Sequence, residues 1–598
     1  MKNIVNQIKI NHKTLKNARL VGKTADPFFL LKDTLINVYS ESVTFLTSVV
    51  LIKYVLDSLQ RKKTFDSLLP VLIVIVIVSI LNISLKTYQD NTLRTRHIHL
   101  LGKEVSKRFF SKLSRLPYQE QFNQDTKNIS QFAFSSGAII YYNADVLLSV
   151  YLGYIVSLII NTISVFIYGR WIGLFLLIVF LILTLLLQKV EISVNDAEFK
   201  HTLFKNGESR KSYYYKNNIF LNKQSNLILK TYDASQLFLY KYNDTINSIM
   251  QDEIKKNKKV FFHKILINRG FNFIFFLTYF LCYAYRFIIL KEITVGTLWA
   301  CYGACLAVFS NNLLKYFSVS QNVIQYVNQM SAFFDINEET RSGISLNPEI
   351  DFTIDFENVS FSYPGKERRV LNGINLRIRK GEHIVLLGEN GAGKTTIILL
   401  LYRLFKPVDG RILLNGVDIE QYNLEEYRRF ISVMFQDFKL YPYPLASNIS
   451  LKNDYSELRD DIISNAEGSG LGEVLKKLKN GIDTELTRLF DLDGYVPSGG
   501  ETSKIGFAQQ AMSNGGLFIY DEYDSNIDPI SEMELNRQLL KSEATSLIIS
   551  HRLSIAREAD RIYWLENGRV TEQGSHEELC RLNGKYAALY EQRKRIVS

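Results

Sequence analysis

The stretch GENGAGKTT, residues 388–396, decides the fold of the C-terminal half of this chain. It has the pattern GxxxxGK followed by Thr, it comes after the apolar run Ile384–Leu387, and it leads into a second apolar run, IILLL. Glycines let consecutive backbone N–H groups curl around phosphate oxygens, and a helix that starts after them points its positive end at the same anion. In this strand–loop–helix setting the motif predicts a nucleotide-binding site.

Two side chains of this loop have chemistry of their own. We expect Lys394 to neutralise charge on the β- and γ-phosphates and the Thr395 hydroxyl to ligate Mg²⁺. The predicted cofactors are therefore ATP and Mg²⁺. The predicted ATP-binding residues of the loop are Gly388, Glu389, Asn390, Gly391, Ala392, Gly393, Lys394, Thr395 and Thr396.

Two adjacent acidic residues, Asp521 and Glu522, follow the apolar run Leu517–Tyr520. A strand that ends beside the phosphate loop brings an aspartate to the position that orders Mg²⁺, and the neighbouring glutamate to the position that polarises the attacking water. The sequence therefore predicts Asp521 as a metal ligand and Glu522 as the catalytic base.

Two further polar residues end apolar runs that are predicted to be strands. His551 follows Leu547–Ser550, and we expect it to sense the γ-phosphate. Gln436 ends the run SVMFQ, and we expect its amide to contact Mg²⁺ or the attacking water. His551 and Gln436 thus complete the predicted catalytic set with Glu522.

The long apolar runs all lie before about residue 315. A bilayer core about 30 Å thick needs roughly 20 helical residues to cross it. An amphipathic stretch, residues 24–36, is predicted to lie in the membrane interface before the first span. The six predicted spans are Ser42–Leu56, Ser67–Leu85, Val146–Gly169, Trp171–Gln188, Gly270–Tyr285 and Ile293–Leu314.

The distribution of Lys and Arg predicts how these spans are oriented. The segments 86–145 and 189–269 carry 9 and 15 basic residues, whereas the three short connections carry six. We therefore expect a cell-membrane protein with both long segments and both termini in the cytoplasm. Both segments read as helical extensions of the spans, and their tips, 114–126 and 213–234, are placed to touch a cytosolic partner.

The overall charge and the cysteines exclude other classes. The net charge is +11, and much of it is predicted to face the inner leaflet of the bilayer, so no nucleic-acid partner is expected. The four cysteines form no CxxC pair, and the sequence indicates neither a disulfide framework nor a zinc site.

In these motifs and their order the chain resembles the ATP-binding-cassette (ABC) exporters, in the form that fuses six spans to one cassette. The resemblance covers nearly the whole chain, and it includes Tyr363, which matches the family's adenine-stacking aromatic, and a D-loop-like segment with Asp528. It implies a type IV exporter-like fold, with an all-α six-helix transmembrane domain and an α/β P-loop NTPase cassette. It also implies ATP hydrolysis coupled to export.

The resemblance further implies a dimer of such halves. Each ATP is then held between one chain's phosphate loop and the other chain's signature residues, Ser498, Gly499 and Gly500. The expected domains are residues 1–33 as a tail with the interfacial helix, 34–318 as the transmembrane domain, 319–350 as a linker and 351–598 as the cassette.

The signature segment VPSGGETSK, residues 496–504, departs from the family's Leu-Ser-Gly-Gly-Gln. Glu501 puts a carboxylate near a phosphate, which is unfavourable unless it turns away or pairs with Lys504. A second departure is Tyr523-Asp524, where the family has Pro-Thr. Two assemblies stay open: a homodimer, which we prefer, and a heterodimer whose other half supplies an ordinary signature.

The cargo is specified least. Residues 490–501, FDLDGYVPSGGE, are similar to the branch of the family that exports bacteriocin-type or modified peptides, so we expect a peptide or another amphipathic substrate. The short stretch before the interfacial helix leads us to expect no N-terminal cysteine-protease domain. The alternatives are a lipid or multidrug exporter that forms half of a heterodimer, and an ATP-gated membrane regulator with little transport.

Overall fold

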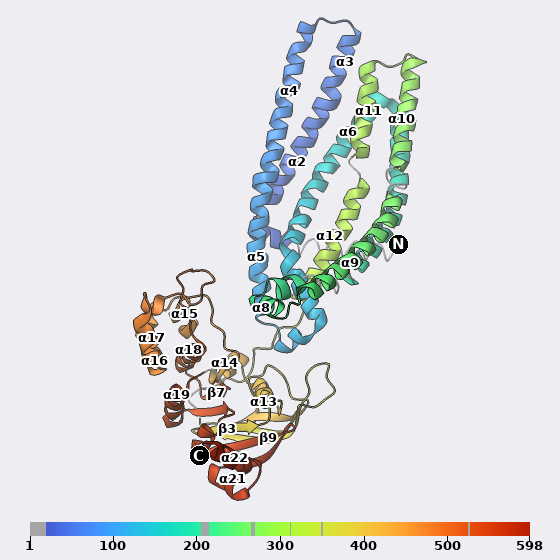
Figure 1. The fold of residues 1–598 in the computed structure, drawn as a ribbon. Coiled ribbons are helices and arrows are strands. Elements are labelled where there is room, and N and C mark those ends of the chain that lie inside the picture. The colour runs from blue at the N-terminus through green and yellow to red at the C-terminus, as the bar shows by residue number, and fades with distance from the viewer. Residues whose placement is uncertain are drawn as a thin grey trace. The chain divides into compact units, whose positions relative to one another are not determined.

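The structure is a computed structural model, and it describes residues 19–204, 214–264, 270–310, 313–347, 351–523 and 527–597. The chain divides into two compact units (Figure 1). The first unit contains the residues up to 116 together with 124–337, and the second contains 117–123 together with the residues from 338 onward.

The described part of the first unit is helical, and its longest helix, α6, packs against α2, α5, α11 and α12. Short π-helical turns η1, η2 and η4 lie at Leu46–Leu51, Gln89–Arg94 and Tyr215–Phe220. The α-helices are α2 Phe29–Phe45, α3 Ile52–Gln60, α4 Phe65–Tyr88, α5 Thr95–Leu113, α6 Gln124–Phe204, α8 Lys223–Thr231, α9 Ser235–Lys264, α10 Phe271–Ile288, α11 Val295–Ser310 and α12 Leu313–Phe334.

The described residues of the six predicted spans lie in helices except Ile293 and Thr294. The helices that contain them are, in order, α2 to α3, α4, the two halves of α6, α10, and α11 with the start of α12. The two halves of α6 meet at Arg170, whose φ of 52° and ψ of −154° interrupt the helix where the sequence predicts a tight hairpin. Within the described residues, Phe29–Gln60, Phe65–Leu113 and Ser136–Leu176 are long and apolar enough to cross a membrane, and Phe273–Ile288 is a shorter apolar helix.

The predicted single interfacial helix over 24–36 is wrong. Residues 19–25 are helical, the chain turns at Asp26–Phe28, and α2 then begins at Phe29 and continues into the first span. Pro27 has no N–H to donate to a helix, and the Asp26 carboxylate accepts a hydrogen bond from the Phe28 N–H at 3.2 Å. We call residues 19–25 the interfacial helix from here on.

Buried ionisable residues join the helices of the first unit near the start of α2. Asp33 is fully buried, and it accepts hydrogen bonds from Arg94 Nε at 2.9 Å and from Gln89 Nε2 at 2.8 Å. Such groups persist in an apolar setting only when they are paired and hydrogen-bonded. Asp33 is not among the residues predicted from the sequence, because a single carboxylate in an apolar stretch gives no sign of its distant partners.

The second unit contains two sheets. An antiparallel sheet has the order β2-β1-β4-β5, and a larger sheet has the order β10-β9-β3-β8-β7-β6, in which every pairing except β10 with β9 is parallel. The strands are β1 Thr353–Phe361, β2 Leu371–Arg379, β3 His383–Gly388, β4 Asp409–Leu414, β5 Val417–Asp418, β6 Ile431–Met434, β7 Leu517–Asp521, β8 Thr545–Ile549, β9 Arg561–Glu566 and β10 Arg569–Gly574.

The helices of this unit surround the larger sheet and form a second packed cluster around α15, α16 and α18. They are α13 Lys394–Leu401, α14 Leu424–Phe430, α15 Leu445–Ser450, α16 Arg459–Gly468, α17 Gly472–Lys477, α18 Gly499–Ala511, α19 Pro529–Lys541, α20 Leu553–Glu558, α21 His576–Leu582 and α22 Lys585–Val597.

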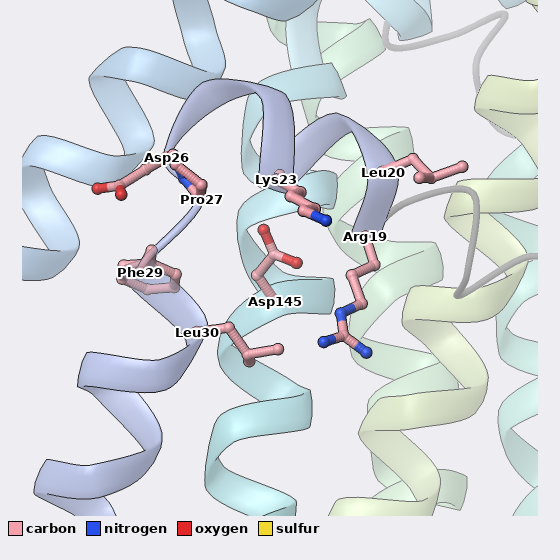
Figure 2. Close-up of a pocket in the computed structure, with 9 residues that line it drawn as sticks. Arg19, Leu20, Lys23, Asp26, Pro27, Phe29, Leu30 and Asp145 are labelled. Atoms are coloured by element: carbon pink, nitrogen blue, oxygen red, sulfur yellow. The ribbon is translucent and has the colours of Figure 1, made fainter.

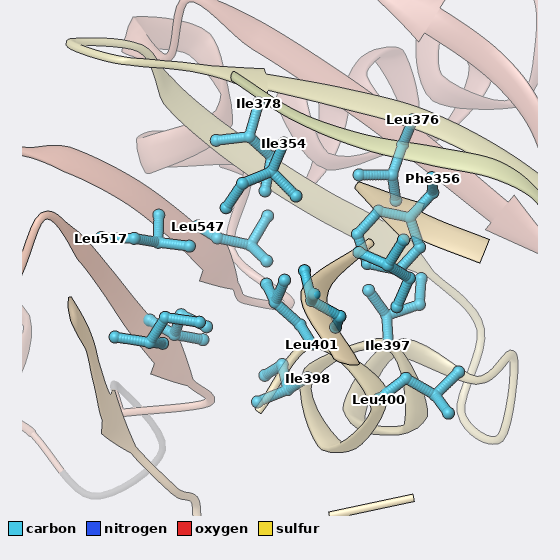
Figure 3. Packing of buried hydrophobic residues seen from close by; sticks show 14 of the residues in the cluster. Ile354, Phe356, Leu376, Ile378, Ile397, Ile398, Leu400, Leu401, Leu517 and Leu547 are labelled. Atoms are coloured by element: carbon cyan, nitrogen blue, oxygen red, sulfur yellow. The ribbon is translucent and has the colours of Figure 1, made fainter. Parts of the chain in front are cut away.

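The main core fixes the position of the phosphate loop. Apolar side chains of α13, such as Ile397 and Leu401, pack between Ile354 of the antiparallel sheet and Leu517 and Leu547 of the parallel sheet (Figure 3). All five side chains are shielded from solvent. Because the helix that follows the loop is packed on both sides, the loop that joins β3 to α13 has a defined position.

The segment 117–123 belongs to the second unit and carries a 3₁₀ turn, η3, at Tyr118–Phe122. The rings of Tyr118 and Phe122 lie 5.6 and 5.4 Å from that of Phe405, and Tyr118 packs on the main core. The sequence predicts that this tip touches a cytosolic partner, and its aromatic residues indeed contact the C-terminal half of the chain.

Candidate active site

The phosphate loop begins where β3 ends. Gly388, Gly391 and Gly393 have φ values of 148°, 79° and 103°, which side chains other than glycine rarely allow. A Cβ at Gly388 would lie 2.2 Å from the Leu565 carbonyl oxygen, and a Cβ at Gly393 would lie 2.5 Å from a Leu371 methyl group. The two glycines therefore serve both the curl of the loop and its close packing.

Lys394 is the first residue of α13, and its side chain is buried. Its Nζ donates hydrogen bonds to the carbonyl oxygens of Gly388 at 2.8 Å and Glu389 at 3.1 Å, so the ammonium group curls back under the loop. Burial lowers the pKa of Lys394, and the negative charges of Glu522 and Asp521 oppose that shift. A cation held in this position is ready to meet a bound polyphosphate.

Asp521 ends β7 and is 1% exposed. The Thr395 hydroxyl lies 3.5 Å from Asp521 Oδ1, so the two predicted metal ligands are neighbours. The pKa of Asp521 is raised to about 6, mainly by burial: the hydrogen bond from Thr395 opposes this rise, the charge of Glu522 adds to it, and the charge of Lys394 opposes it. A buried carboxylate beside a hydroxyl provides hard oxygen ligands, which Mg²⁺ prefers.

The three predicted catalytic residues meet at the next position. Glu522 Oε2 accepts a hydrogen bond from Gln436 Nε2 at 2.6 Å, and Glu522 Oε1 lies 3.1 Å from His551 Nε2. Gln436 follows β6 and His551 follows β8, so three neighbouring strands supply the triad. Glu522 itself has a φ of 49°, a strained value for a residue with a side chain, and such strain gathers at functional sites.

Tyr363 lies at the edge of the loop. Its hydroxyl is 3.0 Å from Thr396 Oγ1, and its ring packs edge-on against Phe361 and Phe405. The ring of Phe122 from the 117–123 segment lies 6.5 Å away. The sequence identified Tyr363 but not Phe122 or Phe405, since nothing in the local pattern joins residues so far apart.

The Glu501 carboxylate is hydrogen-bonded within its own signature segment. Ser498 is the N-cap of α18, and its hydroxyl accepts a hydrogen bond from the Glu501 N–H. The Glu501 carboxylate turns back, accepting from the Ser498 N–H at 2.7 Å and from the Tyr495 hydroxyl at 3.0 Å. No described ion pair joins Glu501 to Lys504, so of the two expected solutions the first is the one present. The pattern Ser-x-x-Glu signals such a capping box, and the sequence analysis overlooked it.

The hydrogen bonds within the signature segment also shift the pKa of Glu501. Partial burial raises its pKa, but the hydrogen bonds from Ser498 and Tyr495 outweigh that effect and lower it overall. Ser498 and Gly499 remain exposed at the start of α18. Their polar groups face solvent at a helix N-terminus, where an anion is favoured.

The second departure, Tyr523, is compensated by packing. Its ring is 2% exposed and lies 5.1 Å from that of Phe507 on α18 and 5.6 Å from that of Tyr520 on β7. Its hydroxyl donates to Asn536 Oδ1. Gln510 also ties α18 to the strands, because its Nε2 donates to the carbonyl oxygens of Ser432 and Ile519.

The predicted site residues thus fall into two groups. The loop residues, Asp521, Glu522, Gln436 and His551 lie together at the carboxyl ends of β3, β6, β7 and β8. The signature residues make no described hydrogen bond to that group. Asp528 caps α19 by accepting from the Ser531 N–H at 3.0 Å, and 524–526 of the D-loop-like segment lie outside the described residues.

A groove of about 810 Å³ runs beside β6 and α18. Phe438, Ile449 and Met512 supply apolar lining, and Arg429 and Gln509 supply polar lining. It is formed within the cassette by segments from both of its packed clusters.

Known proteins resemble this chain in sequence and in fold. Residues 371–525 fit the family model of the ABC transporter. The chain is 33% identical over 306 residues to an ATP-dependent lipid A-core flippase from Haemophilus ducreyi, covering 50% of this chain and 52% of the relative. It is 34% identical over 321 residues to a protein of the same name from Alcanivorax borkumensis, covering 52% and 53%. The chain thus spans about half the length of the curated relatives it matches.

A solved structure resembles nearly the whole chain. It is a bacterial Atm1-family ABC exporter with ATP bound, and it matches with a TM-score of 0.78 at 20% identity, covering 94% of this chain and 98% of the other. The chain therefore has the type IV fold of an ABC exporter, a helical transmembrane unit fused to an ABC cassette.

Proposed function

We propose that this chain is one half of an ATP-driven exporter, in which ATP binding and hydrolysis at the cassette move an amphipathic substrate across the membrane. The observation that carries the proposal is the meeting of Gln436, Glu522 and His551 beside the phosphate loop. A carboxylate held between an amide and an imidazole, next to a buried lysine, is the equipment of a phosphoryl-transfer site.

We propose that the phosphate loop and the residues beside it bind the nucleotide. The N–H groups of residues 388–396 and the start of α13 face the phosphates, and Lys394 exchanges its bonds to loop carbonyls for bonds to phosphate oxygens. Tyr363 stacks on the adenine. Its ring is already held by Phe405, so it offers a fixed surface.

The residues present fit a magnesium ion. Thr395, Asp521 and Gln436 offer a hydroxyl, a carboxylate and an amide, all of which are oxygen ligands. When bound, the ion neutralises charge on the β- and γ-phosphates. Because Asp521 is buried, it holds its carboxylate in place without the aid of the metal.

Hydrolysis then depends on Glu522. Its carboxylate orients a water and accepts a proton from it as the water attacks the γ-phosphate, giving ADP and phosphate. Gln436 and His551 hold the two carboxylate oxygens in place, and His551 also donates to the γ-phosphate. All three side chains are exposed enough to be reached by a nucleotide.

The site is completed in our proposal by a second chain. Ser498, Gly499 and Gly500 present a helix N-terminus to solvent, and they bind the γ-phosphate held by the partner's loop. Since Glu501 is bonded within its own capping box, it does not spoil this surface. That favours a homodimer with two competent sites over a heterodimer that needs an ordinary signature from its other half.

We also propose that the groove beside β6 and α18 binds the tip of one of the long helical segments that follow the membrane spans.

For the substrate we favour a lipid-like amphipath over a peptide. Both curated relatives described above carry the name lipid A-core flippase, and this favours a lipid over the peptide that the signature segment suggests. Both relatives match over half their length, so the substrate is inferred at the level of chemical class: a polar head on an apolar body.

Reconstitution into proteoliposomes tests the function. We expect ATP-dependent movement of a labelled glycolipid between leaflets, together with ATP hydrolysis that the glycolipid stimulates, and neither in a Lys394→Ala variant. Stimulation by peptides alone would restore the peptide hypothesis. Nucleotide binding without movement of any substrate would favour the ATP-gated regulator instead.

A further inference from the structure

A pocket of about 280 Å³ lies beneath the interfacial helix in the first unit, apart from the cassette (Figure 2). Four charged side chains line it: Arg19 and Lys23 from the interfacial helix, Asp26 from the turn after it, and Asp145 from α6. The charges therefore balance, two positive and two negative. Neither the proposed nucleotide chemistry nor the predicted spans accounts for them.

Asp145 forms the floor of the pocket and is 5% exposed. Its Oδ2 lies 3.0 Å from Nε2 of the fully buried His97, whose ring stacks on Phe29 at 3.6 Å. The contact with His97 is the one hydrogen bond that Asp145 makes among the described residues. A Cβ at Gly22 would lie 1.9 Å from Oδ2, so the glycine makes room for the carboxylate under the helix. The pocket thus has a charged group that is positioned by other parts of the fold.

Arg19 and Lys23 stand one helical turn apart and both are exposed. Figure 2 shows both side chains beside the Asp145 carboxylate. In the part of the chain that the structure describes, neither cation has a hydrogen bond or an ion pair within 4 Å. The helix is held instead by Thr24, which accepts a hydrogen bond from Arg108 at 3.1 Å. The two cations are therefore free to bind a ligand without loss of the helix's anchor.

The setting of the pocket points to a lipid. Leu20, Phe28, Leu31 and Leu35 are each more than half exposed, and they lie on the interfacial helix, on the turn and on the start of α2. Because α2 leads into a segment long and apolar enough to cross a membrane, these side chains face acyl chains near the level of the headgroups. A ligand that fills the pocket has its polar part inside and its apolar part along this surface.

We infer that the pocket binds the headgroup of a zwitterionic aminophospholipid, one with a phosphate and a primary ammonium group. Arg19 and Lys23 take the phosphate, and Asp145 takes the ammonium group, whose N–H donors suit a carboxylate. An anionic phosphoglycerol headgroup brings no cation to the Asp145 carboxylate. A choline headgroup has no N–H to donate. The residues that line the site all belong to the first unit and not to the cassette.

Native mass spectrometry of the full-length protein in detergent tests this inference. The protein is mixed with equal amounts of phosphatidylethanolamine, phosphatidylglycerol and phosphatidylcholine of the same acyl chains. We expect phosphatidylethanolamine to bind about 10-fold more tightly than either of the others, as one or two charge-assisted hydrogen bonds imply. Equal binding of all three lipids overturns the inference. A separate arm with soluble glycerophosphoethanolamine distinguishes sources: competition shows that the headgroup alone suffices, and specific lipid binding without competition shows that the acyl chains are required.

Variants locate the site. The pair Arg19→Gln and Lys23→Gln removes exposed cations, so the fold is preserved, and we expect it to lower phosphatidylethanolamine binding about 10-fold. Asp145→Asn is expected to abolish the preference for phosphatidylethanolamine over phosphatidylglycerol. The matched control is Lys32→Gln, an exposed cation on α2 that does not line the pocket. Equal losses in the control and in the Arg19 and Lys23 pair would contradict a specific site, as would a pair variant that binds like the parent protein.

Discussion

The carboxylate of Glu501 accepts a hydrogen bond from the backbone N–H of Ser498 at 2.7 Å, while the Ser498 hydroxyl caps the N–H of Glu501 in return. The residue that makes the signature segment atypical is therefore part of its local structure. Its charge is engaged by the start of α18 and by Tyr495, so the exposed Ser-Gly-Gly surface keeps the groups that bind an anion.

We expect Glu501→Gln to change ATP turnover by less than about twofold, because glutamine also serves at the third position of a capping box. Glu501→Ala removes the box, and we expect it to lower the free energy of unfolding by about 1 kcal/mol and to reduce turnover. The chain offers a matched control in a second capping box, Ser575 with Glu578. Glu578→Ala should cost similar stability while leaving turnover unchanged. A large rise in turnover in Glu501→Gln would show that the carboxylate handicaps the site.

Tyr523 should matter for the stability of the cassette. Tyr523→Ala removes a buried ring from contact with Phe507 and Tyr520, and we expect a loss of about 3–5 kcal/mol in unfolding free energy. Tyr523→Phe keeps the ring and leaves Asn536 without that donor, so a loss of about 1–2 kcal/mol is expected. Thermal or chemical unfolding of the full-length protein measures both. Tyr441→Ala, at a tyrosine that is 56% exposed, is the control, and equal effects at both positions would refute the packing argument.

The raised pKa of Asp521 gives a pH dependence. Burial raises the pKa to about 6 in the free protein, so the carboxyl group stays protonated well above the ordinary value of 3.8. A metal ligand must be deprotonated, and Mg²⁺ therefore competes with a proton below about pH 6. We expect the affinity for Mg²⁺ in the presence of saturating ATP to fall about tenfold between pH 7 and pH 5. Asp521→Asn has no such group, and a pH dependence as steep as the parent's in that variant would assign the effect elsewhere.

Lys394 should govern nucleotide affinity. Lys394→Ala removes a buried cation that now bonds to the loop carbonyls of Gly388 and Glu389, and we expect ATP to bind about 10- to 100-fold more weakly. Fluorescence titration with a labelled nucleotide measures this. Lys406→Ala, at an exposed lysine paired with Glu420, is the control and should bind as the parent does. Parent-like affinity in Lys394→Ala would place the nucleotide elsewhere.

The sequence was sufficient for those features that depend on local pattern. Apolar runs that end in Gly388, Asp521, Gln436 and His551 predicted strands, and the structure places all four at one edge of the parallel sheet. The spans were readable for the same reason, since a helix in lipid needs a continuous apolar stretch.

Features that depend on distant contacts could not be predicted. The contact of Phe122 with Phe405 joins segments far apart in the chain, as does that of Asp33 with Arg94. The break at Pro27 is a local signal that the prediction of a single helix over 24–36 did not use. The capping box of Ser498 was also readable, but the partnership of Glu501 with Tyr495 required the structure.

The central claim is that this cassette hydrolyses ATP with Glu522 as the base, and steady-state ATP turnover by purified protein tests it most directly. We expect the parent protein to release phosphate from Mg-ATP, and we expect Glu522→Gln to lower that rate at least about 100-fold while it still retains ATP. Turnover in Glu522→Gln within a few-fold of the parent's, or a parent protein that retains no Mg-ATP, would contradict the account.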